Sequence, residues 1–338
     1  MMRREGGARV NREHSNPMKI LVTGAGGQVG LDLIRRLLAA GDRVHASDVA
    51  PRPPSDIPES ELPWHRLDVT DAAAVSALVA ELRPDAIFHL AALLSARGEQ
   101  NPQLAYAVNQ GGTFNVLEAC RVHGVRQLVF TSTIAVFGPG LTSPVPDDVA
   151  LHPTTMYGVT KIAGELLGDY YRVRYGLDFR AVRFPGLLSA TLPGGGSSDY
   201  APLMFIEGLR VGHYQAFCRP DTAIPMMYMP DGIRALFELS RAPRERLSRS
   251  VYNIAAFSPT AQEIADAAAA VIPGARFTFE PDPRRQSILD SWPRALDDAL
   301  ARRDWGWEPD YDLPRMADAL VPEVQELLRR HPDLQIAH

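Results

Sequence analysis

The feature that most constrains the fold is an apolar run followed by three glycines, within Lys19–Gly30, which reads KILVTGAGGQVG. Ile20–Val22 predicts a strand buried on both faces of a parallel sheet. Gly24, Gly27 and Gly30 separate it from LDLIRRLLAA, which has helical spacing. Such a turn lets backbone N–H groups approach a pyrophosphate, and the helix N-terminus adds partial positive charge. This order is typical of a dinucleotide-binding unit.

An acid follows at the distance that such a unit requires. Asp48 ends the next apolar strand, Arg43–Asp48, 24 residues after Gly24. A carboxylate there can bind the adenosine ribose hydroxyls, and its charge disfavours a 2′-phosphate. The sequence thus predicts NAD rather than NADP, with Arg52 as the one nearby residue that argues the other way. An ordinary loop with a solvated Asp is the disfavoured alternative.

A second acid, Asp68, follows the third predicted strand, Trp64–Leu67. Two interpretations of it stay open: a bond to the adenine amino group, or a place in the turn before the next helix. Thr70 or Asp71 is expected to cap that helix, which reads AAAVSALVAEL.

Strand and helix patterns alternate from Met18 to about Arg183, and the further strands are expected at 86–90, 127–131 and 179–183. A long helix is expected at about 102–122. Repeated β-α units predict an α/β fold with a doubly wound parallel sheet. Gly and Pro become denser after Pro185, which predicts a smaller C-terminal α+β lobe for the substrate. The predicted organisation is a disordered extension at 1–17, an NAD-binding domain at 18–185, and a lobe at 186–338 with some segments returning to the first domain.

Composition narrows the class of protein. The net charge of −5 gives no electrostatic case for nucleic acid, and no apolar run is long enough to span a bilayer. Two cysteines, Cys120 and Cys218, are too few for a disulfide framework, so a reducing, cytoplasmic compartment is expected. No cluster has metal-ligand spacing, so no metal is expected.

Tyr157 and Lys161 carry the predicted chemistry. Their i, i+4 spacing places them on one face of a helix, where an ammonium can lower the phenol pKa. Thr133, at the end of the fifth strand, can donate a hydrogen bond to a substrate oxygen. The three suit removal of a hydroxyl proton while the carbon gives hydride to NAD. A purely structural pair is the default for this spacing, but the upstream dinucleotide signature reverses that default.

These motifs identify a family resemblance. Residues 23–30, Leu90-Ala91-Ala92, Ser132-Thr133 with Val136-Phe137-Gly138, and Tyr157 with Lys161 resemble the extended short-chain dehydrogenase/reductase superfamily. The resemblance implies Thr133, Tyr157 and Lys161 as a catalytic triad, with Thr133 in place of the usual serine. The candidate cofactor contacts are Gly24, Gly27, Gln28, Val29, Asp48, Asp68, Val69, Leu90, Ala91, Ala92, Asn109, Tyr157, Lys161 and Pro185.

The second half of the chain separates the branches of that superfamily. Nucleotide-sugar enzymes usually carry an Asn where this chain has Pro185, and an Arg in the segment matching Ile224–Asp231, which lacks one. A buried diphosphate without cationic partners is costly, which favours a small substrate. PGGGSSDYA, PMMYMPD, RQSILDSWP and DWGWEPDYDL resemble the short-chain-type L-threonine 3-dehydrogenases.

This closer resemblance implies NAD-dependent oxidation of L-threonine at its 3-hydroxyl to 2-amino-3-oxobutanoate. The candidate substrate contacts are Ser95, Thr133, Tyr157, Gly196, Ser198 and Asp199, with Asp199 placed to pair with the substrate ammonium. Trp292 is expected to be a packing anchor. The alternatives are a dehydrogenase or epimerase of another small hydroxy acid or sugar, and a non-catalytic NAD sensor. A homodimer through the helices containing Asn115 and Ile162 is expected from resemblance alone.

Overall fold

The computed structural model describes residues 17–52, 57–191, 196–332 and 334. The predicted extension at 1–17, Pro17 apart, lies outside the described residues, as do Pro193 to Gly195 of the PGGGSSDYA motif.

Seven parallel strands form the central sheet, in the order β10-β6-β5-β4-β1-β2-β3. The strands are β1 Lys19–Thr23, β2 Arg43–Asp48, β3 Trp64–Arg66, β4 Ala86–His89, β5 Gln127–Thr133, β6 Asp178–Phe184 and β10 Val251–Asn253. The predicted doubly wound parallel sheet is thereby confirmed. The strand order reverses between β1 and β4, and ligands bind beyond the carboxyl ends of the strands at such a point.

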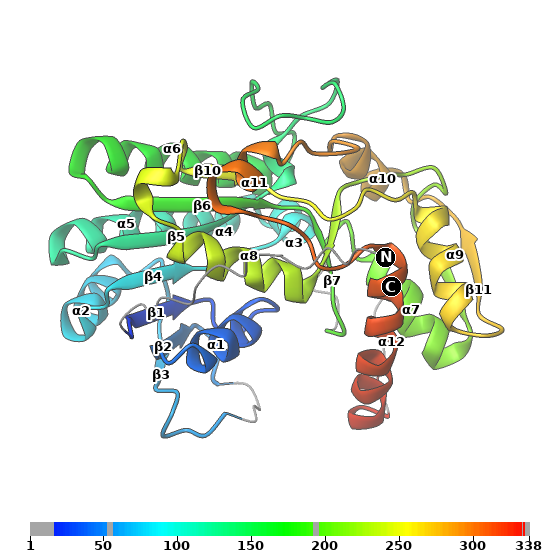
Figure 1. Cartoon of the computed structure of the whole chain (residues 1–338), viewed down its shortest axis with the longest axis horizontal. Coiled ribbons are helices and arrows are strands. Elements are labelled where there is room, and N and C mark those ends of the chain that lie inside the picture. Colours follow the sequence, from blue (N-terminus) through cyan, green and yellow to red (C-terminus); the bar gives the residue numbers. More distant parts are fainter. Residues whose placement is uncertain (1–16, 53–56, 192–195, 333, 335–338) are drawn as a thin grey trace, which may run out of the picture.

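Helices cover both faces of the sheet (Figure 1). One face carries α1 Gly30–Ala39, α8 Met229–Arg241 and α11 Ala299–Trp305; the other carries α2 Ala72–Leu82, α5 Gly112–His123 and α6 Met156–Tyr175. Each face has its own apolar core, centred on Leu33, Ile34 and Leu236 on the first and on Val79, Leu117 and Phe179 on the second. The α2 helix is capped by Asp71, whose side chain accepts from Ala74 N.

The helix predicted over 102–122 is continuous but not uniformly α. It consists of α4 Pro102–Ala105, a π-helical stretch η1 Tyr106–Gly111, and α5. Its turns pack tightly on the loop after β3: a Cβ on Gly112 would lie 2.6 Å from Val69 Cγ2. Glycine therefore sets how near this helix comes to the loop.

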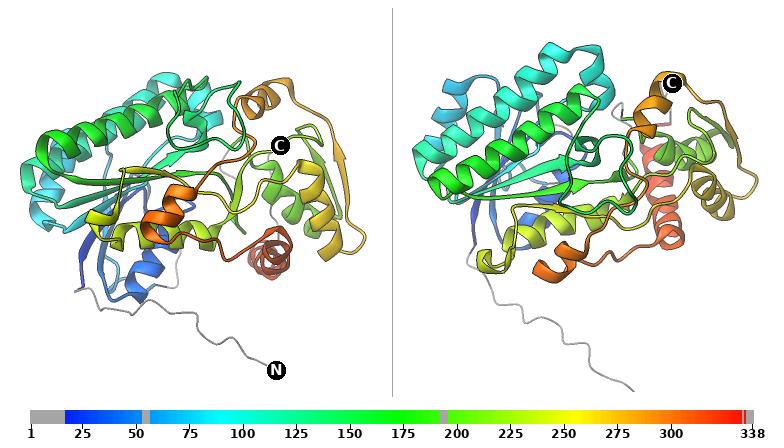
Figure 2. Two further views of the ribbon diagram at one scale, coloured as in Figure 1. Left: turned by 45° about the horizontal axis from the view of Figure 1, so that its top comes forward. Right: turned by 90° about the horizontal axis from the view of Figure 1, so that it is seen from above.

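A smaller lobe follows in the second half of the chain (Figure 2). It contains β7 Gly186–Leu188 paired with β9 Met226–Tyr228, β8 His213–Ala216 paired with β11 Arg276–Phe279, and the helices α7 Tyr200–Val211, α9 Ala261–Val271, α10 Pro283–Asp290 and α12 Leu313–Arg330. Its separate core packs α7 against α9 and α12. The predicted α+β lobe is confirmed. The strand β10 comes from the second half of the chain but belongs to the central sheet, and the domain limits themselves stay a prediction. In the described part of the chain, helices of the length and apolarity needed to cross a membrane are absent.

Candidate active site

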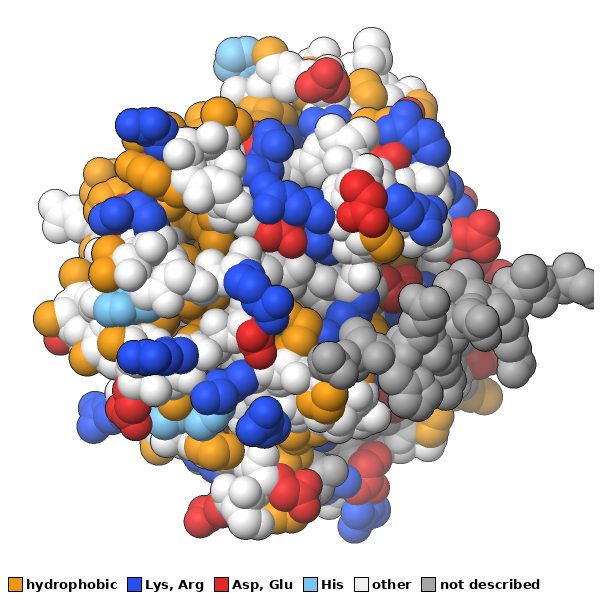
Figure 3. All heavy atoms as spheres, turned by 60° about the vertical axis from the view of Figure 1, so that its left-hand side comes forward, with side chains coloured by type: hydrophobic (Ala, Val, Ile, Leu, Met, Phe, Trp, Pro, Cys, Tyr) orange, Lys and Arg blue, Asp and Glu red, His pale blue; other side chains and the backbone are white. Residues whose placement is uncertain are grey.

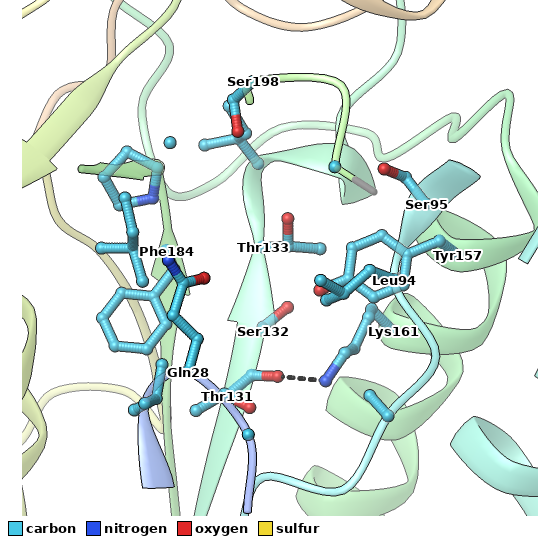
Figure 4. A pocket seen from close by; sticks show the side chains of 18 of the residues that line it. Gln28, Leu94, Ser95, Thr131, Ser132, Thr133, Tyr157, Lys161, Phe184 and Ser198 are labelled. Carbon is cyan, nitrogen blue, oxygen red and sulfur yellow. Dashed lines mark hydrogen bonds between the residues drawn. The ribbon is translucent and has the colours of Figure 1, made fainter. Parts of the chain in front are cut away.

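A cavity of about 240 Å³ opens at the carboxyl ends of the central strands, between the sheet and the lobe (Figure 4). Fourteen of the predicted site residues line it: Gly24, Gly27, Gln28, Val29, Leu90, Ala92, Ser95, Thr133, Tyr157, Lys161, Pro185, Gly196, Ser198 and Asp199. Residues from both halves of the sequence thus meet in one place. Five others, Asp48, Asp68, Val69, Ala91 and Asn109, are not part of its lining.

The glycine turn forms one wall of the cavity and has no room for a side chain at two of its glycines. Gly24 has φ +69°, and a Cβ there would lie 2.5 Å from Ala91 N. A Cβ on Gly30 would lie 2.2 Å from Ala25 O. The first residue before α1, Val29, provides no side-chain cap, so the first N–H groups of α1 lack that partner. A bare turn before an uncapped helix N-terminus fits the pyrophosphate of NAD.

The two predicted acids lie beyond the turn. Asp48 Oδ2 accepts from Gly26 N at 2.9 Å and Oδ1 accepts from Ala50 N at 3.0 Å, so this carboxylate braces the glycine turn from outside. Asp68 Oδ1 accepts from the backbone N and the hydroxyl of Thr70. The turn interpretation of Asp68 therefore describes its contacts in the protein, and a role toward adenine stays a prediction.

Asn109 lies behind the lining of the cavity, and its predicted contact with the cofactor stays a prediction. Its side chain is buried: Oδ1 accepts from Leu93 N at 2.7 Å, while Nδ2 donates to Leu93 O at 3.0 Å and to Thr160 Oγ1 at 3.1 Å. The amide is thus engaged with the loop after β4 and with α6. It supports the cavity wall instead of lining the cavity.

The helix α6 and strand β5 bring the predicted triad together. Thr155 caps α6 by accepting from Gly158 N, so Tyr157 lies in the first turn and Lys161 one turn later. Lys161 Nζ donates to Thr131 O at 2.6 Å and lies 5.7 Å from the centre of the Tyr157 ring. Thr133 follows two residues after that carbonyl; its hydroxyl oxygen accepts from Ala135 N at 3.2 Å, and its side chain acts to lower the pKa of the Tyr157 phenol. Figure 4 shows the three side chains around the same space.

Burial controls the protonation of the pair. It raises the pKa of Tyr157 to about 12, against a smaller lowering by the hydrogen bond with Thr133. It also lowers the pKa of Lys161 to about 7, with Glu165 acting in the opposite direction. The expected lowering of the Tyr157 pKa by Lys161 is therefore not found, because burial of the phenol dominates its pKa.

The other predicted substrate contacts lie on the side of the triad away from Gln28 of the glycine turn (Figure 4). Ser95 begins α3 Ser95–Gln100 and is 3% exposed, while Gly196 and Ser198 precede α7. Asp199 Oδ2 accepts from Gly196 N at 2.7 Å, which holds the end of the glycine loop against the start of α7.

Sequence reasoning missed part of the lining. Trp292, expected as a packing anchor, lines the cavity, as do Leu94 and Ser197. The signal for Trp292 was its place in the RQSILDSWP motif. Sequence reasoning also missed a bond between the two halves: Gln28 Nε2 donates to Ser189 Oγ at 2.7 Å, joining the glycine turn to the residue after β7. Across the described ranges, no three His, Cys, Asp or Glu side chains group as metal ligands would.

A family model described as "NAD dependent epimerase/dehydratase family" matches residues 20–255. The chain belongs to this family of NAD-dependent enzymes. It is 42% identical over 311 residues to the mitochondrial L-threonine 3-dehydrogenase of Bos taurus, covering 91% of this chain and 83% of that protein. The solved L-threonine dehydrogenase of Phytophthora infestans is 42% identical with a TM-score of 0.84, covering 91% of this chain and 99% of that one. The holo form of the GalE-like L-threonine dehydrogenase of Cupriavidus necator is 39% identical with a TM-score of 0.85. The match covers 90% of this chain and 99% of that one.

Proposed function

We propose that this protein oxidises L-threonine at its 3-hydroxyl with NAD, giving 2-amino-3-oxobutanoate. The observation that carries the proposal is the single cavity in which Tyr157, Lys161 and Thr133 lie between the glycine turn and the Gly196–Asp199 segment. The relatives named L-threonine 3-dehydrogenase, at about 40% identity over most of the chain, support the same substrate.

Each residue has a defined task in the proposed reaction. Thr133 donates a hydrogen bond to the substrate hydroxyl oxygen and orients it toward Tyr157. Tyr157 removes the hydroxyl proton as general base. Lys161 holds the nicotinamide ribose and, as an ammonium, stabilises the Tyr157 phenolate. Bound NAD supplies the acceptor for the hydride that leaves the substrate carbon.

The charges around the cavity favour a small amino acid over a nucleotide-sugar. Lys161 is the one Lys or Arg among the described lining residues. Its ammonium already donates to Thr131 O beside Tyr157. A diphosphate would lack the cationic partners that its burial requires. Asp199 is proposed to meet the substrate ammonium, and the Ser198 hydroxyl its carboxylate.

The test is NADH formation at 340 nm with L-threonine, beside D-threonine, L-serine, an amine-free hydroxy acid, and NADP in place of NAD. Turnover that is much the best with L-threonine and NAD supports the roles of Asp199 and Asp48 together. Turnover with the amine-free acid alone would remove the proposed ammonium contact and favour the second candidate, a dehydrogenase of another small hydroxy acid. Tight NADH binding without any turnover would favour an epimerase or a cofactor sensor.

The rate is expected to depend on pH through the buried pair. The productive form has an ammonium at Lys161 and a phenolate at Tyr157, one proton fewer than the fully protonated pair. Because the pKa of Lys161 is lowered to about 7 and that of Tyr157 raised to about 12, the pair loses its first proton near pH 7. We expect kcat/KM to rise about tenfold per pH unit below 7 and to level off above it. If kcat/KM instead keeps rising at that slope up to pH 9, the Lys161–Tyr157 pair does not lose its first proton near pH 7, and the prediction is wrong.

A homodimer is proposed from the surface of α5 and α6, which lie side by side (Figure 2). This surface exposes large apolar side chains, and Figure 3 shows hydrophobic side chains between Lys and Arg side chains on one face of the molecule. The exposed apolar residues on these helices are Phe114, Val122, Val159, Leu166, Tyr170, Val173 and Tyr175. Apolar surface of this extent marks an interaction site in soluble proteins.

The dimer makes a measurable prediction. The wild type is expected at twice the 37.1 kDa chain mass in light scattering, and Leu166→Glu with Val173→Glu at one chain mass, because two charges would be buried unpaired. Val211→Glu, at another exposed apolar position, on α7, is the control and should stay dimeric. A wild type of one chain mass would contradict the proposal.

The protein is also proposed to reside in a reducing compartment of the cell, namely the cytoplasm. Cys120 and Cys218 are both free thiols and both buried. Recovery of the native protein in another compartment on cell fractionation would overturn this assignment.

A further inference from the structure

Behind the triad lies a buried carboxylate to which the proposed reaction assigns no task. Glu165 is 4% exposed and lies one turn after Lys161 on α6. Tyr157, Lys161 and Glu165 follow at successive i, i+4 steps, so all three share one face of the helix. A carboxylate in such a place is costly to bury unless its charge is used or paired.

The contacts of Glu165 connect it to the strand that carries the catalytic groups. Arg183 of β6 donates from Nε to Oε1 at 3.0 Å and from Nη2 to Oε2 at 2.8 Å. The Ser132 hydroxyl donates to Oε1. Ser132 stands between Thr131, whose carbonyl accepts from Lys161, and Thr133. The carboxylate is thus held in a set position relative to Lys161 and Thr133, the two partners of Tyr157.

The charges on this side of the site alternate in sign. Beyond Arg183, Nη1 donates to Asp147 O at 3.0 Å and to Asn253 Oδ1 at 3.3 Å, and Arg249 lies 3.9 Å from the Asp147 carboxylate. The sequence of buried and half-buried charges is Lys161, Glu165, Arg183, Asp147, Arg249. Removing Glu165 would take away the charge that raises the pKa of Lys161 and would leave Arg183 without its carboxylate partner.

We propose that Glu165 is a positioning residue of the reaction, whose carboxylate, held by Arg183 and Ser132, keeps Lys161 an ammonium. The proposal rests on the function proposed for Lys161 above. In this proposal the Glu165–Arg183 ion pair not only joins α6 to β6 but also sets the protonation state of Lys161.

The other groups around Lys161 do not replace Glu165. Burial lowers the pKa of Lys161 to about 7, and the Glu165 charge raises it. His89 of β4 also faces Lys161, but burial lowers the pKa of His89 to about 3, so it is neutral at working pH. Its ring instead bonds to the hydroxyls of Thr23 and Thr113. On the next turn of α6, Asp169 is paired with Arg172.

The composition of the chain allows a direct measurement. Its only two lysines are Lys19 and Lys161. In protein labelled with ¹³C-lysine and carrying Lys19→Arg, the one remaining Cε signal reports the titration of Lys161 without cofactor or turnover. We expect Glu165→Gln to move the midpoint of that titration down by about one pH unit, a tenfold change in the protonation equilibrium. Glu165→Asp keeps the charge and is expected to keep the midpoint.

The pH profile of kcat/KM is the second readout. Glu165→Gln should superimpose on the wild type at low pH, where Lys161 is protonated in both, and fall below it as the new midpoint is passed. A variant damaged only in structure would be slower by the same factor at every pH. An unchanged lysine midpoint, or such uniform slowing, overturns the proposal.

A second variant protects the test against loss of folding. Glu165→Gln leaves the buried Arg183 without its full partner, whereas Glu165→Met with Arg183→Met removes the pair as a unit, a change that proteins often tolerate. It is expected to lower the lysine midpoint as well, and an unchanged midpoint in it counts against the proposal. The proposed function fails separately, through a Tyr157 variant that retains turnover, because the lysine titration requires none.

Discussion

Tyr157→Phe is expected to lower turnover of L-threonine by a factor of about 10²–10⁴, the usual contribution of a general base. Phenylalanine keeps the ring in the first turn of α6 but removes the hydroxyl that would receive the substrate proton. Loss of that oxygen removes a step of the chemistry without emptying the cavity. NADH binding, followed by fluorescence, should change by only a few fold.

The pairing of these two measurements makes the result informative. Weak NADH binding together with lost turnover would mean that the substitution disturbed the cofactor site and tested nothing about proton transfer. Turnover above about a tenth of the wild type would remove Tyr157 from the role of base.

Gly158→Ala is expected to have a comparable effect through geometry alone. A Cβ at this position would lie 2.1 Å from Ala135 O and 2.7 Å from Pro153 Cβ. Because both atoms are well packed, the first turn of α6 would have to move away from the short helix Ile134–Val136, and Tyr157 would move with it. A displacement of about 1 Å between reacting groups can cost about 10²-fold in rate. Overpacking of this kind also costs about 1–3 kcal/mol of stability.

The control for this substitution is Gly111→Ala, in the helix that packs beside α6. The nearest atom to a Cβ there is Tyr106 O at 3.9 Å, so alanine meets no obstacle. It should keep full turnover and gain up to about 1 kcal/mol in the free energy of unfolding. Comparable turnover in both variants, with both chains folded by thermal denaturation, would show that the approach of α6 to Ala135 does not set the position of Tyr157.

The sequence predicts those parts of this molecule that depend on local pattern. The glycine turn, the spacing of Tyr157 and Lys161, and the apolar strands each follow from neighbouring residues, and the structure places them in one site. His89, within the apolar strand β4, is likewise a core residue whose ring nitrogens bond to two hydroxyls.

What depends on distant contacts could not be predicted. No local pattern shows that β10 pairs with β6, or that Trp292 reaches a cavity built mainly from the first half of the chain. The balance between burial and charge at Lys161 likewise depends on which groups the fold brings near it. The π-helical stretch Tyr106–Gly111 carries no sequence signal that distinguishes its wider turn from an α-helical one.

The grip of Asn109 on the loop after β4 has a consequence for how such a site changes over evolutionary time. Its amide bonds to both backbone groups of Leu93, as a neighbouring strand would. These two hydrogen bonds do not depend on the side chains of the loop. Exchanges at Ala92, Leu94 or Ser95, which line the cavity, therefore remove neither of them. While Asn109 is conserved, substitutions among these lining residues can therefore change the substrate specificity without a change in how Asn109 holds the loop.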